Sequence, residues 1–275
     1  MSLFELAKQH IITVAHRGVA GGNIPCNTFT AYETALKQGA DMIETDVDIS
    51  ADGTLIVFHP GMEKPHLGID RRLNTLPYAE IESLRYTNQD GVPTQFGIER
   101  FEELLCCFGG RCYINVDKFW DNPEAIYEAV KKAGATDRVL VKSHLNDTVL
   151  HTLERVAPDL PFMPIVRDSH PRHAELMERN VNYVGAEVLF ASEEAEVASD
   201  SFISAMHGDG KLVWVNSIIY NYKTQLAAGH SDDTALSEDM DKGWGWLADK
   251  GFDIIQTDWP GMLVEYLKQT GRYFK

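Results

Sequence analysis

Short apolar runs alternate with amphipathic helical patterns along the whole chain, and this alternation constrains the fold more than any other feature. "IITVA" precedes the helical stretch "NTFTAYETALKQG", and the same order recurs down to "FDIIQTD" and "PGMLVEYLKQT". Strands that alternate with helices of about ten residues predict βαβ units and a parallel sheet. Nine runs have strand character. One of them is expected to be antiparallel, which leaves the eight parallel strands of an α/β fold of the (β/α)8 TIM barrel type.

The antiparallel strand is predicted from the turn between "DMIETDVDI" and "TLIVFH". The connection is too short for a parallel crossover, and Asp-Gly between two strand-like runs is a strong hairpin signal. With a two-residue turn at 52–53, paired residue numbers sum to 105, which places His59 opposite Asp46. The β-hairpin extension after strand two therefore brings His59 back to Glu44 and Asp46 at the C-terminal mouth of the barrel, where active sites of this fold lie.

We expect one catalytic domain over residues 1–275, with two additions to the barrel. A mainly polar insertion follows the hairpin at about 60–98. A loop at 217–241 follows a barrel strand, so it emerges at the mouth, where we expect it to act as a lid. Its "GHSDD" stretch leaves a second cation site open as an alternative, although His and Asp are also frequent in solvated loops.

Composition limits the partners. The 275 residues include 41 Asp and Glu against 25 Lys and Arg, a formal net charge of −16. Such a surface repels polyanions, so we expect no nucleic-acid partner and no stable membrane association. No stretch approaches ~18 apolar residues, and the N-terminus lacks signal-peptide character, so a cytoplasmic location is expected. The four cysteines are expected to be reduced. Nothing in the pattern specifies an oligomeric state.

Charged and titratable side chains stand at the ends of the first strands. His16 and Arg17 end the first run, Glu44 and Asp46 share one face of the second, and Asp117 ends the next parallel strand. Three carboxylates at one mouth offer hard oxygen ligands, which suit Mg²⁺ or Ca²⁺ better than zinc. We therefore predict one divalent cation at these carboxylates.

Polar residues also end the strands further round the predicted barrel. They are Lys142, Glu187, Trp214, Asn216 and Asp258. We take Lys142, Trp214 and Asn216 as candidate substrate-binding residues, with a core or rim position as the alternative for Trp214. Lys118 directly follows Asp117 and is expected on the opposite strand face, away from the site.

The order of these residues resembles the glycerophosphodiester phosphodiesterase family. The resemblance is carried by "AHRG", "GADMIETD", "DGTLIVFH" and "GFDIIQTDWP", dense over residues 14–59 and 251–260 and thin between them. It implies a (β/α)8 barrel in which His16 and His59 are the acid/base pair, Arg17 binds phosphate, and a divalent cation lies at the three carboxylates.

The chain departs from the family pattern at three places. His59 is followed by Pro60 where the family usually has Asp. The family's third carboxylate usually stands in Glu-x-Lys, whereas this chain has Asp117, Lys118 and then Phe. The loop at 217–241 is longer than in many relatives. We expect Lys142 or the cation to supply the charge of the missing Lys.

The resemblance implies hydrolysis of small glycerophosphodiesters to glycerol 3-phosphate and an alcohol. The glycerol 2-hydroxyl would attack first, and water would open the resulting cyclic phosphate; which histidine is the first base stays open. Two alternatives remain. One is a phosphodiesterase of the same superfamily that acts on lysophospholipid or other head groups, which an exposed apolar rim would favour. The other is a catalytically silent barrel that binds a phosphoester.

Overall fold

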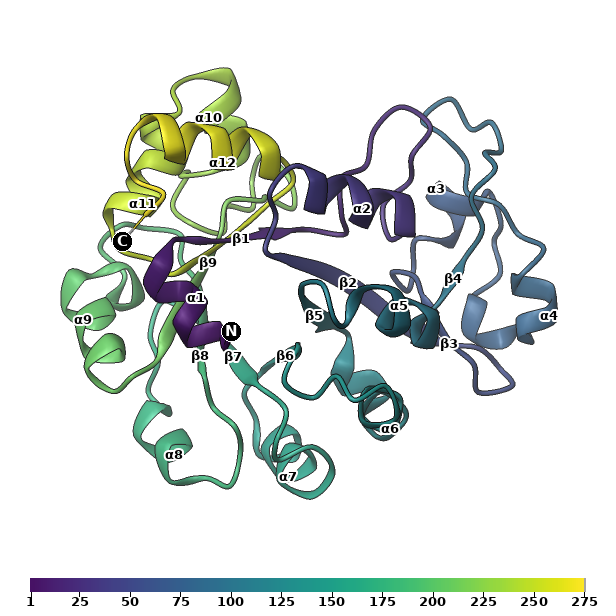
Figure 1. Cartoon of the computed structure of the whole chain (residues 1–275), viewed down its shortest axis with the longest axis horizontal. Helices are drawn as coiled ribbons and strands as arrows, with labels where there is room; N and C mark the ends of the chain where they lie inside the picture. The colour runs from purple at the N-terminus through teal and green to yellow at the C-terminus, as the bar shows by residue number, and fades with distance from the viewer. Residues whose placement is uncertain (275) are drawn as a thin grey trace.

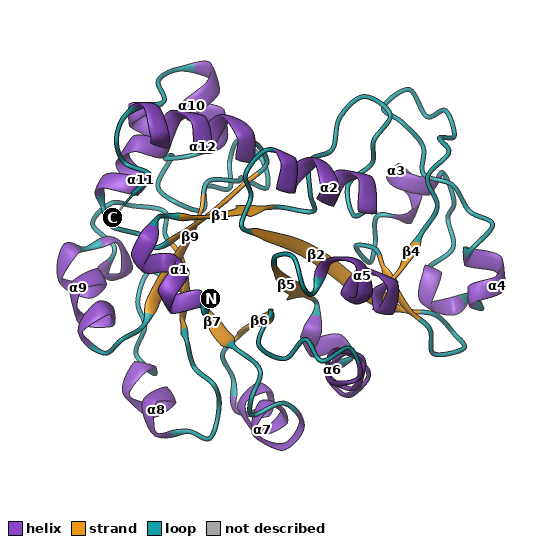
Figure 2. Ribbon diagram, viewed as in Figure 1, coloured by secondary structure: helices purple, strands orange, loops and turns teal. Residues whose placement is uncertain are grey.

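Eight parallel strands close into a ring in the computed structural model, which describes residues 1–274 (Figures 1 and 2). The ring consists of β1 (Ile12–Ala15), β2 (Met42–Ile49), β5 (Tyr113–Asp117), β6 (Val139–His144), β7 (Phe162–Arg167), β8 (Gly185–Leu189), β9 (Leu212–Asn216) and β10 (Ile254–Thr257). Because β1 pairs in parallel with both β2 and β10, the ring is closed. The predicted (β/α)8 TIM barrel is confirmed.

Helices connect the strands and cover the outside of the barrel (Figure 1). The helices of eight or more residues are α2 (Phe29–Lys37), α5 (Phe101–Phe108), α6 (Pro123–Lys132), α7 (Asp147–Val156), α9 (Asp200–Gly208) and α12 (Pro260–Gln269). Shorter elements are α8 (His173–Glu178), α10 (Asp232–Ser237), α11 (Trp246–Asp249), the 3-10 turns η2 (Phe119–Asp121) and η3 (Glu196–Ala198), and the π-helical turn η4 (Asp241–Gly245). Helix starts follow the chemistry of their residues: Thr28 caps α2, and proline begins α6 and α12.

A further helix, α1 (Leu3–Gln9), lies across one end of the barrel (Figure 1). Ser2 and Glu5 form a capping box at its start. Its buried side chains, Leu3 and Ala7, belong to the cluster that fills the barrel interior together with Ile12, Val14, Met42, Tyr113, Leu140, Met163, Val184, Leu212, Trp214 and Ile254. The helix therefore covers the end of the barrel opposite the mouth.

The strand β2 continues beyond the barrel and returns as the antiparallel strand β3 (Leu55–Val57), so the predicted hairpin is confirmed. Its predicted register is wrong by one residue. Val47 pairs with Val57, so paired numbers sum to 104 and the turn holds three residues rather than two. Gly53 adopts φ +88° there, as a three-residue turn with a bulge requires. Since β3 ends at Val57, the strand alternation does not extend to His59.

The insertion after β3 forms a small packed unit at one side of the barrel (Figure 1). It contains α3 (Glu63–Leu67), the 3-10 turn η1 (Leu73–Thr75), α4 (Tyr78–Ile81) and β4 (Glu99–Arg100), which pairs with β3. A separate apolar cluster holds it together, formed by Ile56, Phe58, Leu67, Leu73, Leu76, Ile81, Tyr86 and Ile98. The sequence did not indicate this cluster within the mainly polar insertion, because its apolar residues follow neither a helix nor a strand period.

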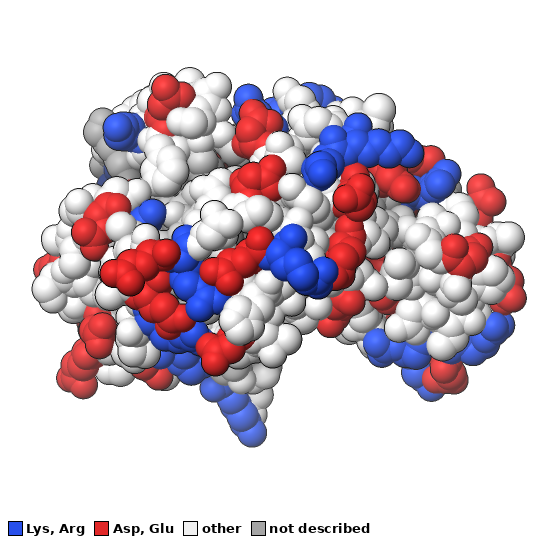
Figure 3. Space-filling model, turned by 90° about the horizontal axis from the view of Figure 1, so that it is seen from below, with Lys and Arg blue, Asp and Glu red and all other residues white. Residues whose placement is uncertain are grey.

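Acidic and basic side chains are interspersed over the face of the molecule shown in Figure 3. Many exposed Lys and Arg side chains form ion pairs with carboxylates. Examples are Lys64 with Asp70 and Arg71 with Glu80. Such exposed pairs contribute little to stability, about 0–1 kcal/mol each. No helix within residues 1–274 is both long enough and apolar enough to cross a membrane.

Candidate active site

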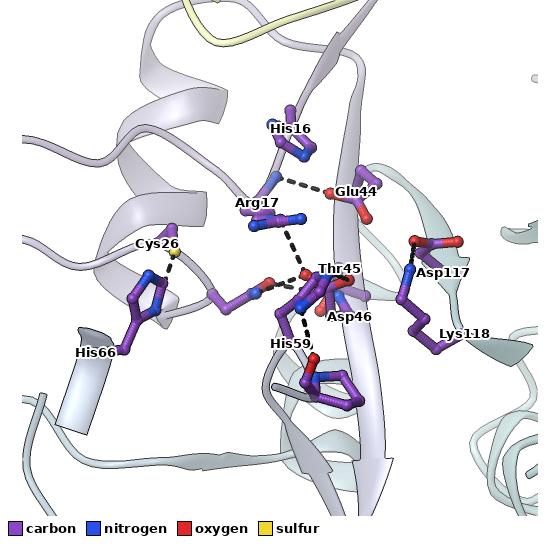
Figure 4. Close-up of polar contacts among 12 residues, drawn as sticks. His16, Arg17, Cys26, Glu44, Thr45, Asp46, His59, His66, Asp117 and Lys118 are labelled. Carbon is purple, nitrogen blue, oxygen red and sulfur yellow. Dashed lines mark hydrogen bonds and ion pairs between the residues drawn. The ribbon is translucent and has the colours of Figure 1, made fainter. Parts of the chain in front are cut away.

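Three carboxylates meet at the ends of β2 and β5 (Figure 4). Asp46 and Asp117 are register partners in the parallel β2–β5 pair, and Glu44 precedes Asp46 by two residues on the same strand face. One ligand oxygen from each carboxylate lies within 4.8 Å of the others. Within the described chain, this is the one cluster of three or more metal-ligand side chains compact enough to hold an ion.

The surroundings of these carboxylates fit a divalent cation. Glu44 and Asp46 are only 3% and 0% exposed. Burial, and then the charge of Asp46, raises the pKa of Glu44 to about 7. Asp46 Oδ1 has no hydrogen-bond partner among residues 1–274. Buried like charges are costly unless a cation or donor compensates them, and carboxylate oxygens are the ligands that Mg²⁺ and Ca²⁺ prefer.

Arg17 lies directly against the carboxylates because its backbone is in the left-handed region, at φ 55°. Its backbone N–H donates to Glu44 Oε2 at 2.9 Å, and its side-chain Nε lies 3.0 Å from Asp46 Oδ2. The next residue, Gly18, has φ +77°, and a Cβ there would lie 2.7 Å from the carbonyl carbon of Ala31 in α2. Glycine is therefore required for the chain to turn out of β1 in this way.

Asn27 is a site residue that the sequence analysis missed. Its side-chain amide donates to Asp46 Oδ2 at 2.9 Å, and its carbonyl oxygen accepts a hydrogen bond from the Tyr32 hydroxyl at 2.9 Å. Asn27 has φ 56°, a conformation that Asn tolerates better than most residues. In sequence, an Asn beside the helix-capping Thr28 is indistinguishable from a second capping residue.

His16 lies at the end of β1 with its Nδ1 2.8 Å from Asp258 Oδ1. The backbone N–H of Asp258 in turn donates to Asp232 Oδ2 at 2.8 Å. Burial lowers the pKa of His16, but its hydrogen bond to the Asp258 carboxylate and the charge of Glu44 outweigh this effect, so the pKa lies above its ordinary value. Sequence reasoning placed Asp258 at a strand end without giving it a role.

His59 follows the hairpin. In Figure 4 it lies beside Asp46, on the opposite side of Arg17 from His16. Its Nδ1 lies 2.9 Å from the Pro60 carbonyl oxygen, which can only accept, so Nδ1 carries the proton. Its Nε2 lies 3.9 Å from Asp46 Oδ1. The predicted proximity of His59 to Asp46 is therefore present despite the shifted register.

Lys118 contacts the site, and the expectation that it points away was wrong. Its backbone adopts φ 63°, which breaks the strand alternation directly after Asp117. Its Nζ lies 2.6 Å from Asp117 Oδ2 (Figure 4). Burial raises the pKa of Asp117, whereas the charges of Lys118 and Lys142 lower it by more, so the pKa is below its ordinary value.

The three residues predicted to bind substrate lie together inside the barrel. Lys142 Nζ is 2.7 Å from Glu187 Oε2 and 3.9 Å from the centroid of the Trp214 ring. Asn216 donates to Glu187 Oε1 at 2.5 Å and accepts from Trp214 Nε1 at 3.0 Å. Trp214 is 0% exposed and belongs to the interior cluster. It therefore occupies the core position that was the alternative to substrate binding. Contact of this group with substrate stays a prediction.

The stretch "GHSDD" is a structural element rather than a second cation site. The His230 ring stacks on Trp246 at 3.8 Å, and its two nitrogens contact the Lys242 carbonyl oxygen and Glu193. Asp232 accepts hydrogen bonds from Ser217, Trp244 and Thr257 side chains, which ties the segment after β9 to the barrel. His230 and Asp232 are thus engaged within the protein, and among the described residues this stretch forms no cluster compact enough to hold an ion.

A hollow of about 670 Å³ opens beside His16 and Arg17. Its lining also includes Asp258, Trp259 and Met262, and the last two are large apolar side chains that remain 49% and 43% exposed. Exposed apolar groups of this size beside a reactive cluster are typical of a ligand-binding surface. The hollow therefore gives solvent access to His16 and Arg17.

The chain is 43% identical over 79 residues to the glycerophosphodiester phosphodiesterase of Bacillus subtilis (strain 168), an alignment that covers 29% of this chain and 25% of that protein. In sequence, the chain resembles the glycerophosphodiester phosphodiesterase family. In the alignments with its curated relatives, the chain spans from 25% to 66% of their lengths. A family model described as a domain of unknown function, DUF4996, matches residues 162–267.

Solved structures of similar proteins show the same fold as this chain. A glycerophosphoryl diester phosphodiesterase from Parabacteroides distasonis superimposes with a TM-score of 0.79 at 17% identity, covering 100% of this chain and 97% of that one. A phosphodiesterase from Oleispira antarctica, in complex with the product sn-glycerol-3-phosphate, has a TM-score of 0.68 at 18% identity and covers 98% and 100%. The predicted family resemblance is confirmed.

Proposed function

We propose that the chain hydrolyses glycerophosphodiesters to glycerol 3-phosphate and an alcohol with the help of one divalent cation. The observation that carries the proposal is the convergence of three carboxylates within 4.8 Å, beside Arg17 at 3.0 Å from Asp46. The product bound to the Oleispira relative supports the same substrate class. Glu44, Asp46 and Asp117 would hold the cation, which would bind a non-bridging oxygen and polarise phosphorus.

Arg17 binds the phosphate from the side of the carboxylates. Its ion pair with Asp46 uses Nε, which leaves the terminal amino groups to clamp phosphate oxygens. Its position is fixed by the hydrogen bond from its own backbone N–H to Glu44. A guanidinium held in this way is already oriented for the charge that develops on the phosphoryl oxygens.

The two histidines divide the proton transfers according to their partners. His59 donates from Nδ1 to the Pro60 carbonyl, so its neutral form presents the lone pair of Nε2 toward the site and suits a general base. His16 donates from Nδ1 to the Asp258 carboxylate, which favours the imidazolium form and suits a general acid. We therefore assign the first deprotonation, of the glycerol 2-hydroxyl, to His59, and protonation of the leaving alcohol to His16.

Lys118 replaces the family lysine as the cationic neighbour of the third carboxylate. The pairing at 2.6 Å with Asp117 supports this assignment, whereas Lys142 pairs with Glu187. The ammonium keeps Asp117 ionised, and an ionised carboxylate is the form that can ligate a cation. We assign Lys118 a positioning role and leave Lys142 inside the barrel.

The proposed function is tested by incubating the purified chain with glycerophosphocholine in the presence of Mg²⁺ or Ca²⁺. Release of glycerol 3-phosphate in stoichiometric amounts with choline supports it. Binding of the diester without release of either product would instead indicate a catalytically silent barrel that binds a phosphoester.

The exposed Trp259 and Met262 favour a second candidate, in which the substrate carries an acyl chain. They line the hollow next to His16 and would cover an alkyl chain of a lysophospholipid. Release of choline from lysophosphatidylcholine faster than from glycerophosphocholine would favour this reading.

We propose further that the whole chain acts as one catalytic domain and that residues 217–241 form a lid. Tyr220 and Tyr222 are 69% and 79% exposed within this segment, while Asp232 anchors its far end. An exposed tip on an anchored base is an arrangement that an active-site lid can use. Shortening the tip between Tyr220 and Lys223 should change the preference among diesters, and unchanged preference would contradict the lid.

A further inference from the structure

A second cavity opens between the loop of residues 20–26 and the insertion. Its volume is about 250 Å³, and the insertion contributes residues 65–66 and 86–89 to its wall. Two of its lining residues, Cys26 and His66, lie on the side of Arg17 opposite Asp117 in Figure 4. Arg17 therefore lies between the cavity and Asp117 in this view.

The cavity is continuous with the active site. Ala20, Cys26 and His66 line both this cavity and the hollow that contains His16 and Arg17. Cys26 Sγ and His66 Nδ1 are 3.9 Å apart, so the loop and the insertion approach one another where the two spaces join. A diester whose phosphate is bound by Arg17 can therefore extend one of its two alcohols into the cavity.

The wall combines apolar residues such as Ile24 and Pro65 with polar, uncharged ones. None of the described residues that line the cavity is Asp, Glu, Lys or Arg. The polar side chains include Asn23, Thr87, Asn88 and Gln89, of which Thr87 donates to the His66 carbonyl and Asn88 to the Asn23 side chain. A Cβ built on Gly21 or Gly22 would meet no atom within 4 Å, so the backbone there is open to a ligand. Neutral donors and acceptors of this kind match the hydroxyl groups of a polyol.

Tyr86 provides an independent sign of a missing partner. It lines the cavity and is 1% exposed, and its hydroxyl has no hydrogen-bond partner among residues 1–274. A buried hydroxyl without a partner costs about 1–3 kcal/mol, so native structures seldom keep one unless a ligand or water satisfies it. The ring is held in place by Phe58 and His66, whose centroids lie 6.1 Å from its own.

The same wall lacks what a quaternary ammonium alcohol needs. Such a cation is recognised by a carboxylate or by open aromatic faces. The described lining contains no carboxylate, and the Tyr86 ring is buried against its neighbours. Burial lowers the pKa of His66, with the charge of Arg17 adding to this effect, so the imidazole is neutral near pH 7.

We propose that this cavity is the subsite for the leaving alcohol of the diester and that it selects an uncharged, polyhydroxylated alcohol over a quaternary ammonium alcohol. The inference rests on the proposed phosphodiesterase function. It assigns Tyr86 and Gln89 as specificity-determining residues, which act on the alcohol and not on the phosphate.

The test compares kcat/KM for glycerophosphoinositol and glycerophosphocholine with the full chain loaded with Mg²⁺. Wild type should prefer glycerophosphoinositol by about tenfold or more. Tyr86→Phe should raise KM for glycerophosphoinositol roughly three- to tenfold, the value of one lost hydrogen bond, and leave glycerophosphocholine unchanged. Since the variant also removes an unsatisfied hydroxyl, its Tm should not fall. Tyr78→Phe, in the same insertion but outside the cavity, is the matched control.

A second variant adds the charge that the wall lacks. Gln89→Glu should shift the preference toward glycerophosphocholine, while Gln95→Glu, outside the cavity lining, should not. Wild-type preference for glycerophosphocholine, or an unchanged ratio in both Tyr86→Phe and Gln89→Glu, would overturn the subsite.

Calorimetric titration with free inositol and free choline tests the subsite separately from the hydrolytic reaction. If neither diester is hydrolysed, the phosphodiesterase function fails, but the subsite still predicts that wild type binds inositol and not choline. It also predicts weaker inositol binding by Tyr86→Phe. Absence of inositol binding in wild type would contradict the subsite whatever the enzymatic result.

Discussion

His16 Nδ1 and Asp258 Oδ1 lie 2.8 Å apart although 242 positions separate them in the chain. The pairing joins the first and the last strand of the barrel at the mouth, because β1 and β10 are neighbours in the closed ring. It gives His16 a fixed orientation and a protonated Nδ1. The proposed general acid thus depends on a carboxylate from the other end of the sequence.

Asp258→Asn should move the pH profile without removing activity. Asp258 is a cause of the raised pKa of His16, so its loss lowers that pKa. If protonated His16 is the acid, the alkaline limb of the kcat profile moves to lower pH, because the imidazole loses its proton earlier. The measurement is kcat from pH 5 to 10, with the exposed Asp70→Asn as control. An unmoved alkaline limb would remove His16 from the acid role.

His16→Ala and His59→Ala should each lower kcat by roughly 10²–10⁴-fold, the usual contribution of a positioned acid or base. Substrate binding should remain, because Arg17 and the carboxylates are unchanged. Equilibrium binding of glycerophosphocholine to the variants checks this separately from turnover. His207→Ala, remote from the site and paired with Asp253, serves as the control. Turnover close to wild type in either site variant would contradict the mechanism.

Asp117→Asn should weaken cation binding. The substitution removes one of the three negative ligands and leaves a neutral amide of the same shape. Calorimetric titration with Mg²⁺ or Ca²⁺ should show at least a tenfold loss of affinity, about 1.4 kcal/mol. Asp121→Asn, four residues later and outside the cluster, is the matched change. Equal affinities for both variants would place the cation elsewhere.

Lys118→Met should move the acidic limit of cation binding to higher pH, whereas the same change at an exposed lysine such as Lys64 should not. Loss of the ammonium raises the pKa of Asp117, since Lys118 is one of the groups that lower it. Cation binding should therefore fall off at a higher pH in the variant than in wild type. An identical pH dependence of cation binding in the two proteins would show that Lys118 does not act on Asp117.

Gly18→Ala should be more destabilising than Gly22→Ala. Both glycines have positive φ, so both variants carry a similar backbone penalty of about 1 kcal/mol. Only at Gly18 does the new Cβ meet backbone, at 2.7 Å from Ala31. Forcing the loop away from α2 should cost roughly 1–3 kcal/mol more and displace Arg17. Urea unfolding measures the difference, and equal midpoints would contradict the close approach.

Regular features of the chain were predictable from sequence, because each has a local physical signature. The alternation of strands and helices predicts the barrel, and the Asp-Gly turn predicts the hairpin. Glu44 and Asp46 share a face because strands have a period of two, and Asp117 ends the neighbouring strand. These placements depend only on repeats of a few residues.

Residues in unusual backbone conformations were not predictable in the same way. Lys118 and Asn27 both have positive φ. Strand alternation therefore placed Lys118 on the wrong face, and no local pattern indicated Asn27 as a site residue. The hairpin register was wrong because the turn took a third residue at Gly53. The Asp258 contact depends on closure of the whole barrel, and no local pattern announces such a contact.

Glycerol 3-phosphate release from glycerophosphocholine, before and after exhaustive EDTA dialysis, tests the central claim most directly. We expect EDTA to abolish product release and Mg²⁺ or Ca²⁺ to restore it, because Glu44, Asp46 and Asp117 would hold the cation beside Arg17 and the two histidines. The same reaction should be lost in His59→Ala at saturating cation. Hydrolysis that continues undiminished without the cation, or in His59→Ala, would contradict the account.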